Sequence, residues 1–168
     1  MNRLLLLRAV PTALLAALFV VPACGSALKA PPKCTTSGLV VWLNTNGDGA
    51  AGSTYFKLEF TNLSGSACTL TGYPGVSGVD RSGHQLGTAA GHDPATAAHT
   101  VTLANGATKA ATLRIVEAGN FPASTCHLTT AAGLRVYPPN QTASKLVPFP
   151  FRACARTGPA YLSVRAVS

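Results

Sequence analysis

The stretch Tyr55-Phe-Lys-Leu-Glu-Phe-Thr61 is the clearest fold signal in this 168-residue chain. Three apolar residues, Phe56, Leu58 and Phe60, alternate with two charged ones, so that apolar and charged side chains fall on opposite faces. A period of two residues is typical of a half-buried antiparallel strand, whereas a helix would place its apolar residues three or four positions apart. The stretch therefore predicts a sheet with one face in a core, and we expect Phe56 and Phe60 in that core.

Outward from this strand, short apolar or alternating runs are separated by clusters of Gly, Asn, Pro and Ser, as in all-β proteins. The other predicted strands are Leu39–Leu43, Ala67–Leu70, Val76–Val79, Gln85–Thr88, His99–Leu103, Lys109–Val116, Gly133–Tyr137, Lys145–Phe151 and Tyr161–Val167. Asn44–Gly49, Asp80–Gly83 and Asn105-Gly106 are predicted turns, and the last two are expected to close hairpins. Pro148 and Pro150 predict an edge strand, because proline cannot donate to a ladder. With no helical segment of useful length, the predicted fold is all-β, an immunoglobulin-like antiparallel β-sandwich.

The composition argues against several functional classes. Five acidic residues occur singly, which speaks against a carboxylate-rich metal cage and against a paired-carboxylate hydrolase. Sixteen Gly and twelve Pro suit neither a coiled coil nor a helical bundle, and 47% apolar content is too high for a disordered chain. The length is that of one domain. The sequence contains no Gly-x-Ser-x-Gly elbow, so we expect no catalytic residues and no cofactor.

The N-terminus has the pattern of an export signal. Arg3 and Arg8 precede the uncharged apolar run Ala9–Val21, which is too short for a transmembrane anchor. Residues 1–23 are therefore predicted to be a signal peptide. Its removal leaves eleven basic and five acidic residues, so the mature protein would carry a net charge of +6.

The end of the apolar run, Val21-Pro-Ala-Cys24, resembles a bacterial lipobox and predicts lipidation of Cys24, although Pro22 is an imperfect position. The protein would then be a lipoprotein at the outer face of the cell membrane, with residues 24–33 as a tether and residues 34–168 as the folded domain. The alternative is ordinary signal cleavage after Ala23, Ala27 or Ala30, which would give a secreted protein.

The cysteine count agrees with export, because cysteines pair in an oxidising compartment and five leave one over. Cys24 is the obvious remainder. The others, Cys34, Cys68, Cys126 and Cys154, lack the close spacing of a zinc or redox site and predict two disulfides. Four cysteines allow three connectivities. We favour Cys34 with Cys68 and Cys126 with Cys154, because each pair closes a loop of about thirty residues and would contribute roughly 3 to 4 kcal/mol.

The order of landmarks resembles a known family. Phe56-Lys-Leu-Glu-Phe-Thr-Asn62 is followed by Ser66-Ala-Cys-Thr-Leu-Thr-Gly-Tyr-Pro-Gly-Val76, and then by Val101-Thr-Leu-Ala-Asn-Gly106 and Leu134-Arg-Val-Tyr-Pro-Pro139. From Cys34 to Ser168 this order is similar to the actinobacterial secreted domain of unknown function (DUF) family numbered 4232. The resemblance implies exported proteins or lipoproteins with paired cysteines, and it implies no activity. Asn105 stands where we expect the family's Pro, a harmless turn substitution.

Histidines and aromatic residues are the remaining candidates for a site. His84, His92 and His99 lie in one short stretch, and a metal or small-ligand carrier would need them, or His127, to converge. We expect no metal site, because their spacing places no two of them side by side on one strand face. Trp42 is expected in the core. Tyr73, Tyr137, Phe149 and Phe151 lie beside prolines, and such loops can form exposed recognition surfaces.

The leading functional hypothesis is an exported, non-catalytic binding or structural module of the cell envelope, held at the membrane by a lipid anchor. Its partner would be an unknown envelope protein or an anionic envelope component such as lipids or wall polymers, which the positive charge would attract weakly. We expect no binding to nucleic acid, because the arginines are dispersed along the chain and the protein is exported. The alternatives are an extracytoplasmic metal or small-ligand carrier and an enzyme of unfamiliar type.

Overall fold

A computed structural model describes residues 29–168 of the chain. The predicted signal peptide, Cys24 and residues 25–28 of the predicted tether lie outside the described residues. Within the described range, no helix has the length and apolar character that crossing a membrane requires.

The described chain is all-β, as predicted, with two short helical turns. Its strands are β1 (Leu39–Ala50), β2 (Ser53–Asn62), β3 (Cys68–Thr71), β4 (Gly75–Val79), β5 (Gln85–Leu86), β6 (Gly91–His92), β7 (Thr100–Leu103), β8 (Thr108–Val116), β9 (Leu128–Tyr137), β10 (Lys145–Cys154) and β11 (Leu162–Val164). The helical turns are η1 (Ala118–Asn120) and α1 (Ala123–Cys126), both between β8 and β9.

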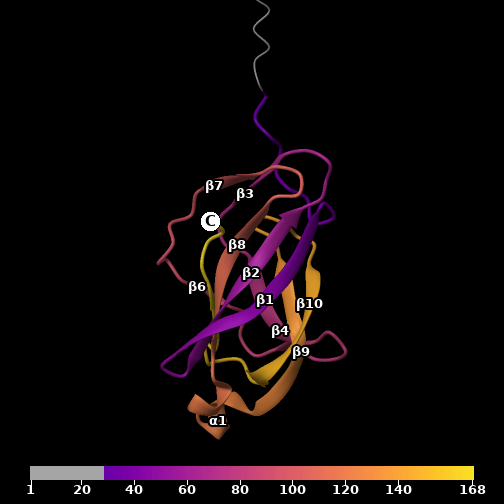
Figure 1. Ribbon diagram of the computed structural model, residues 1–168. Helices are drawn as coiled ribbons and strands as arrows, with labels where there is room; N and C mark the ends of the chain where they lie inside the picture. Colours follow the sequence, from indigo (N-terminus) through magenta and orange to yellow (C-terminus); the bar gives the residue numbers. More distant parts are fainter. Residues whose placement is uncertain (1–28) are drawn as a thin grey trace, which may run out of the picture.

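Two main sheets form the body of the molecule (Figure 1). One has five strands in the order β1-β2-β8-β11-β6, and the other has four in the order β10-β9-β4-β5. A small third sheet pairs β3 with β7 at the end where the chain enters the domain, and α1 lies at the opposite end. Neighbouring strands are antiparallel, except that β6 runs parallel to β11. The arrangement is therefore sandwich-like, while the immunoglobulin-like connectivity stays a prediction.

The core lies between the two main sheets. Leu58, Phe60 and Leu113 from the five-stranded sheet and Leu134 and Val136 from the four-stranded sheet belong to one buried cluster. The alternation in Tyr55–Thr61 thus places Phe60 in the core as predicted, and the half-buried Phe56 packs against its margin.

The prediction that Trp42 lies in the core is wrong, because 43% of this residue is exposed. A continuous apolar run such as Leu39–Leu43 is typical of a strand covered on both faces. In the structure only one face of β1 is covered: Leu39 and Leu43 are buried, whereas Val40 and Trp42 are exposed.

The prediction of a turn over Asn44–Gly49 is also wrong. β1 continues to Ala50, and two extra residues are accommodated where its register with β2 shifts between Asn44 and Asp48. The chain reverses instead at Ala51 and Gly52, which both have positive φ angles, 42° and 72°. Two positive φ angles in a two-residue hairpin loop are the mark of a type I′ turn, which matches the twist of the strands.

Replacing Ala51 by Asn is expected to raise the free energy of unfolding by about 1 kcal/mol, because Asn tolerates the left-handed conformation better than Ala does. Urea denaturation of Ala51→Asn measures the effect, with Ala50→Asn, one residue earlier in the strand, as the control. An equal gain in both variants would contradict the assigned turn.

The two predicted hairpin connections have different outcomes. Asp80–Gly83 does connect paired strands, β4 and β5. The prediction for Asn105-Gly106 is wrong, because β7 pairs with β3 and β8 pairs with β2 and β11. The Gly106 N–H donates to the Asn62 carbonyl (2.6 Å), so the turn is held by the end of β2 while the chain crosses between sheets. The prediction that the strand with Pro148 and Pro150 lies at a sheet edge is confirmed.

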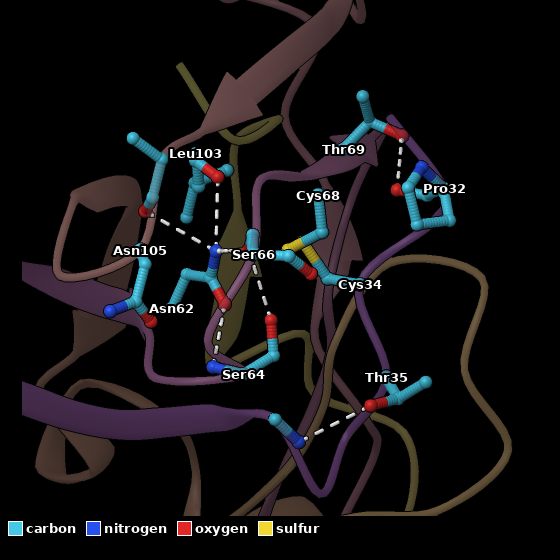
Figure 2. The surroundings of a disulfide bond; sticks show 12 residues. Pro32, Cys34, Thr35, Asn62, Ser64, Ser66, Cys68, Thr69, Leu103 and Asn105 are labelled. Carbon is cyan, nitrogen blue, oxygen red and sulfur yellow. Dashed lines mark hydrogen bonds between the residues drawn. A yellow bond between two sulfur atoms is a disulfide. The ribbon is translucent and has the colours of Figure 1, made fainter. Parts of the chain in front are cut away.

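Both favoured disulfides are confirmed. Cys34 is bonded to Cys68 and Cys126 to Cys154, with Cα atoms 4.9 and 4.5 Å apart. The first ties the entry of the domain to β3 and lies beside Asn62 (Figure 2). The second ties the end of α1 to the end of β10. Two disulfides agree with an oxidising, extracytoplasmic environment.

Candidate functional site

A cavity of about 440 Å³ opens between the sheets at the end that carries the β1–β2 turn. It is lined by residues 49–54, Phe56, residues 115–117, Phe149, Phe151 and Arg152. The hairpin turn forms one wall, the end of β8 another, and β10 brings residues from the opposite sheet. We call it the aromatic cavity, after the three phenylalanine rings that line it.

The rings come from both layers of the sandwich. Phe56 of β2 meets Phe149 of β10 edge to face, with ring centroids 5.0 Å apart. The ring centroids of Phe149 and Phe151 are 5.9 Å apart. The β10 register against β9 shifts by one residue between Pro148 and Phe151. Such a bulge redirects side chains locally, and here both phenylalanines pack against the core cluster.

This arrangement partly matches the expectations from sequence. The prolines beside Phe149 and Phe151 make an exposed recognition surface one possibility for these residues, and the structure shows instead that they are half-buried and line a cavity. Phe56 was predicted to be core, yet its half-buried ring faces the same cavity. Tyr73 and Tyr137 do not line this cavity.

The rim of the aromatic cavity carries an ion pair. Arg152 Nε lies 3.6 Å from Glu117 Oε1, and the two side chains are 60% and 53% exposed. The same Glu117 oxygen accepts a hydrogen bond from the Gly119 N–H (3.2 Å) and so caps η1. An exposed pair of this kind adds little stability, so the contact positions Arg152 without fixing it.

Beneath the rings lies Tyr161, whose ring centroid is 6.4 Å from that of Phe151. Its side chain is buried, and its hydroxyl donates to the Leu86 carbonyl (2.8 Å). Burial raises the pKa of Tyr161 to about 12. The phenol therefore keeps its proton to a higher pH than an exposed tyrosine does.

The raised pKa of Tyr161 predicts a loss of stability in strong alkali. An unfolded tyrosine titrates near its ordinary value of 10.0, so between that pH and about 12 the folded state keeps a proton that the unfolded state loses. The stabilisation is complete below pH 10.0 and declines as the pH rises towards about 12. Urea denaturation at several pH values should show a steeper decline for the wild type than for Tyr161→Phe. Parallel declines would contradict the assignment.

His84, His92 and His99 each make a separate contact. His84 Nδ1 lies 3.2 Å from Asp80 Oδ2, His92 stacks on Tyr73 with centroids 4.2 Å apart, and His99 contacts the Ala97 carbonyl. In residues 29–168 no three His, Cys, Asp or Glu side chains are grouped so that they could hold a metal ion. The convergence that a histidine-based metal carrier requires is not found in the described chain.

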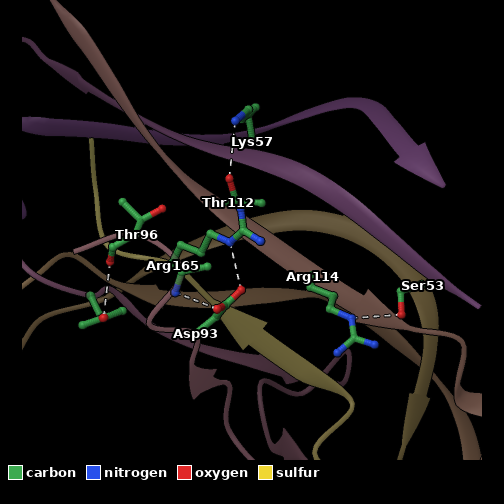
Figure 3. A network of polar contacts seen from close by, with 9 residues as sticks. Ser53, Lys57, Asp93, Thr96, Thr112, Arg114 and Arg165 are labelled. Carbon is green, nitrogen blue, oxygen red and sulfur yellow. Dashed lines mark hydrogen bonds and ion pairs between the residues drawn. The ribbon is translucent and has the colours of Figure 1, made fainter. Parts of the chain in front are cut away.

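Polar contacts cluster on the outer face of the five-stranded sheet (Figure 3). Arg165 Nε donates to Asp93 (2.8 Å), Arg114 Nε to Ser53 Oγ (3.0 Å), and Lys57 Nζ to a threonine on β8 (3.4 Å). The Arg165 hydrogen bond lowers the pKa of Asp93. Arg114 and Arg165 are far apart in the sequence, so their proximity could not be read from it. Each of these cations already contacts a neighbouring side chain.

A second hollow, of about 760 Å³, lies between the Asp80–Gly83 turn and β9. It is larger than the aromatic cavity, but no aromatic ring lines it. Ligand sites are mostly apolar with a few convergent polar groups. On this chemistry the aromatic cavity is the better candidate, although the other hollow has the larger volume.

Comparison with known proteins agrees with the resemblance in the sequence. Residues 34–168 match the family described as domain of unknown function (DUF4232). No curated protein and no solved structure matches the chain. The matched range contains both disulfides, all the described strands and the whole aromatic cavity. With most of its length matched, the chain belongs to the DUF4232 family.

Proposed function

We propose that the protein is an exported, lipid-anchored, non-catalytic binding module of the cell envelope, which holds an apolar group of its ligand in the aromatic cavity. The export pattern of residues 1–23, the lipobox-like Cys24 and the two disulfides support its location. The cavity supports its mode of action.

The observation that carries the proposal is an open cavity with three phenylalanine rings between the two main sheets. Its volume of about 440 Å³ lies within the range of small-ligand sites. Its polar side chains are Ser53, Thr54, Glu117 and Arg152, and neither His nor Cys lines it. A nucleophile needs an adjacent base, and in the described chain the Ser53 hydroxyl contacts Arg114 and neither hydroxyl is hydrogen-bonded to Glu117, so this lining suits binding better than an enzyme of unfamiliar type. Of the two carrier alternatives, the same lining favours a carrier of a small ligand over a carrier of a metal ion.

Binding in the aromatic cavity can be tested with N-phenyl-1-naphthylamine, an uncharged probe with a naphthyl and a phenyl group that fluoresces in apolar surroundings. The protein would be the mature chain, residues 24–168, with Cys24→Ala, which cannot be acylated. We expect saturable binding that Phe149→Ala weakens by about tenfold, because one wall ring is lost. Tyr137→Ala, which removes another proline-adjacent ring outside the cavity, is the control. No saturable binding, or equal losses in both variants, would overturn the proposed site.

The anchor requires a separate measurement. We would determine intact masses, before and after reduction with alkylation, for native protein from membrane and culture-medium fractions. The proposal predicts an acylated Cys24 on a membrane form, with the other four cysteines alkylated only after reduction. A soluble form that starts after Ala27 or Ala30, with no acylated form, would overturn the lipid anchor.

A further inference from the structure

We propose that the aromatic cavity selects amphiphiles in which an apolar group carries an anionic headgroup, and that the Arg152 guanidinium binds this headgroup. The inference deepens the proposed function and rests on it, because it needs the cavity to be a ligand site. It goes further by naming the chemical class of the ligand and the residue that selects it.

The first argument is the position and unused capacity of Arg152. The residue follows Phe151 directly and lines the same cavity, and its side chain is mostly exposed, so its guanidinium is accessible to a headgroup that emerges from the cavity. Its Nε faces Glu117, and its two Nη atoms have no hydrogen-bond partner in the described part of the chain. A guanidinium presents its donors as a planar fork that fits carboxylate, sulfonate or phosphate oxygens.

The second argument is that Glu117 already has a structural role. Its Oε1 accepts from the Gly119 N–H and faces Arg152, while its backbone N–H donates to the Gly52 carbonyl (2.9 Å). Glu117 thus belongs to the junction of β8, η1 and the hairpin turn. A cationic headgroup would have to compete with Arg152 for this carboxylate, whereas an anionic headgroup finds free donors.

The third argument is the charge of the whole domain. Residues 29–168 contain eleven basic and five acidic residues, so anions are attracted towards the domain before they bind. The rings then provide the apolar contact, and Arg152 provides the discrimination between an anionic ligand and a neutral ligand of the same shape.

The test compares two probes with related ring systems. 1-Anilinonaphthalene-8-sulfonate carries a sulfonate, and N-phenyl-1-naphthylamine lacks it. With the Cys24→Ala chain, Arg152→Gln is expected to weaken sulfonate binding about tenfold and to change binding of the neutral probe by less than about twofold. Glu117→Gln is expected to strengthen sulfonate binding, since it removes a competing negative charge and keeps an acceptor oxygen. The control is Arg81→Gln, at the exposed Asp80–Gly83 turn, which removes the same charge outside the aromatic cavity. It should change the binding of neither probe.

The outcomes separate this inference from the proposed function. If the neutral probe binds but Arg152→Gln leaves sulfonate binding unchanged, the inferred selectivity for anions is overturned, while the aromatic cavity remains supported as a ligand site. If neither probe binds, the proposed site fails as well. If Arg81→Gln weakens sulfonate binding and Arg152→Gln does not, the anion binds at the Asp80–Gly83 turn and the inference is overturned.

The source of the headgroup can be distinguished with two competitors. Displacement of the sulfonate probe by 1-naphthoate supports a free aromatic acid. Co-sedimentation with phosphatidylglycerol vesicles that is lost in Arg152→Gln supports a lipid in its bilayer. If neither competitor acts through Arg152, an anionic amphiphile is not the ligand class.

Discussion

Replacing Asn62 with Ala is expected to lower the free energy of unfolding by about 3 to 5 kcal/mol. Asn62 is fully buried at the end of β2 (Figure 2). Its Nδ2 donates to the carbonyls of Ser66 (2.8 Å), Leu103 (3.0 Å) and Ala104 (3.2 Å), and its Oδ1 accepts from the Ser64 N–H (3.0 Å). One side chain therefore joins β2, the loop before β3 and the end of β7. Truncation would leave several enclosed backbone groups without partners.

Urea denaturation of two further variants makes this prediction specific. Asn105→Ala removes one exposed hydrogen bond, from the Gly65 N–H, and should lower the free energy of unfolding by less than about 1 kcal/mol. Asn62→Asp keeps the shape but turns a carboxylate towards three carbonyls, which favours its protonated form in the folded state. The folded pKa of this Asp would then exceed the unfolded one, so the variant should be more stable at pH 4 than at pH 7. A loss below about 1 kcal/mol in Asn62→Ala would contradict the assigned role.

Removing either disulfide is expected to lower the free energy of unfolding by roughly 3.5 to 4 kcal/mol in the chain-entropy treatment. The bonded cysteines are separated by 34 residues in Cys34–Cys68 and by 28 in Cys126–Cys154. Because this entropy grows slowly with loop length, the two losses should be nearly equal. The double variants Cys34→Ala/Cys68→Ala and Cys126→Ala/Cys154→Ala can be compared by urea denaturation. A loss below about 1 kcal/mol in either would contradict a structural role for that bond.

The same two variants should differ in ligand binding. Cys126–Cys154 holds the end of β10, the strand that carries Phe149 and Arg152, and Cys126 Sγ lies 3.6 Å from the Ala118 carbonyl oxygen in η1. Cys34–Cys68 lies by β3, at the other end of the sandwich. Loss of Cys126–Cys154 should therefore weaken binding of the neutral naphthylamine probe to the folded protein, while loss of Cys34–Cys68 should not. The reverse order would contradict the position of the site.

The fold could be predicted where local patterns and tertiary structure agree. The alternation in Tyr55–Thr61 arises because one face of the strand is covered and the other is open, so it predicted the strand and its buried face. The disulfides could be predicted because both favoured cysteine pairs have similar separations in the sequence. Prediction failed where tertiary contacts override a local signal. Asn105-Gly106 forms the predicted turn, but this turn is hydrogen-bonded to Asn62 at the end of β2. The following strand, β8, therefore pairs with β2 in the five-stranded sheet and not with β7.

The aromatic cavity could not be predicted, because it depends on residues that are distant in the chain. Phe56 and Phe149 meet only because β2 and β10 lie in facing sheets, and a register shift in β10 directs the second ring. The prolines on either side of Phe149 did mark it as a recognition candidate. Nothing in the sequence links Arg152 to Glu117, since their contact requires the fold.

The central claim is that the aromatic cavity is a ligand site, and amide chemical-shift mapping tests it most directly. The isotopically labelled Cys24→Ala chain would be titrated with N-phenyl-1-naphthylamine and followed by two-dimensional ¹H–¹⁵N NMR. The structure predicts saturable shifts concentrated at residues 49–54, 115–117 and at Phe149, Phe151 and Arg152, with little change at Asp80–Gly83. Shifts centred on that turn or on the outer face of the five-stranded sheet, or no saturable shifts, would contradict the claim.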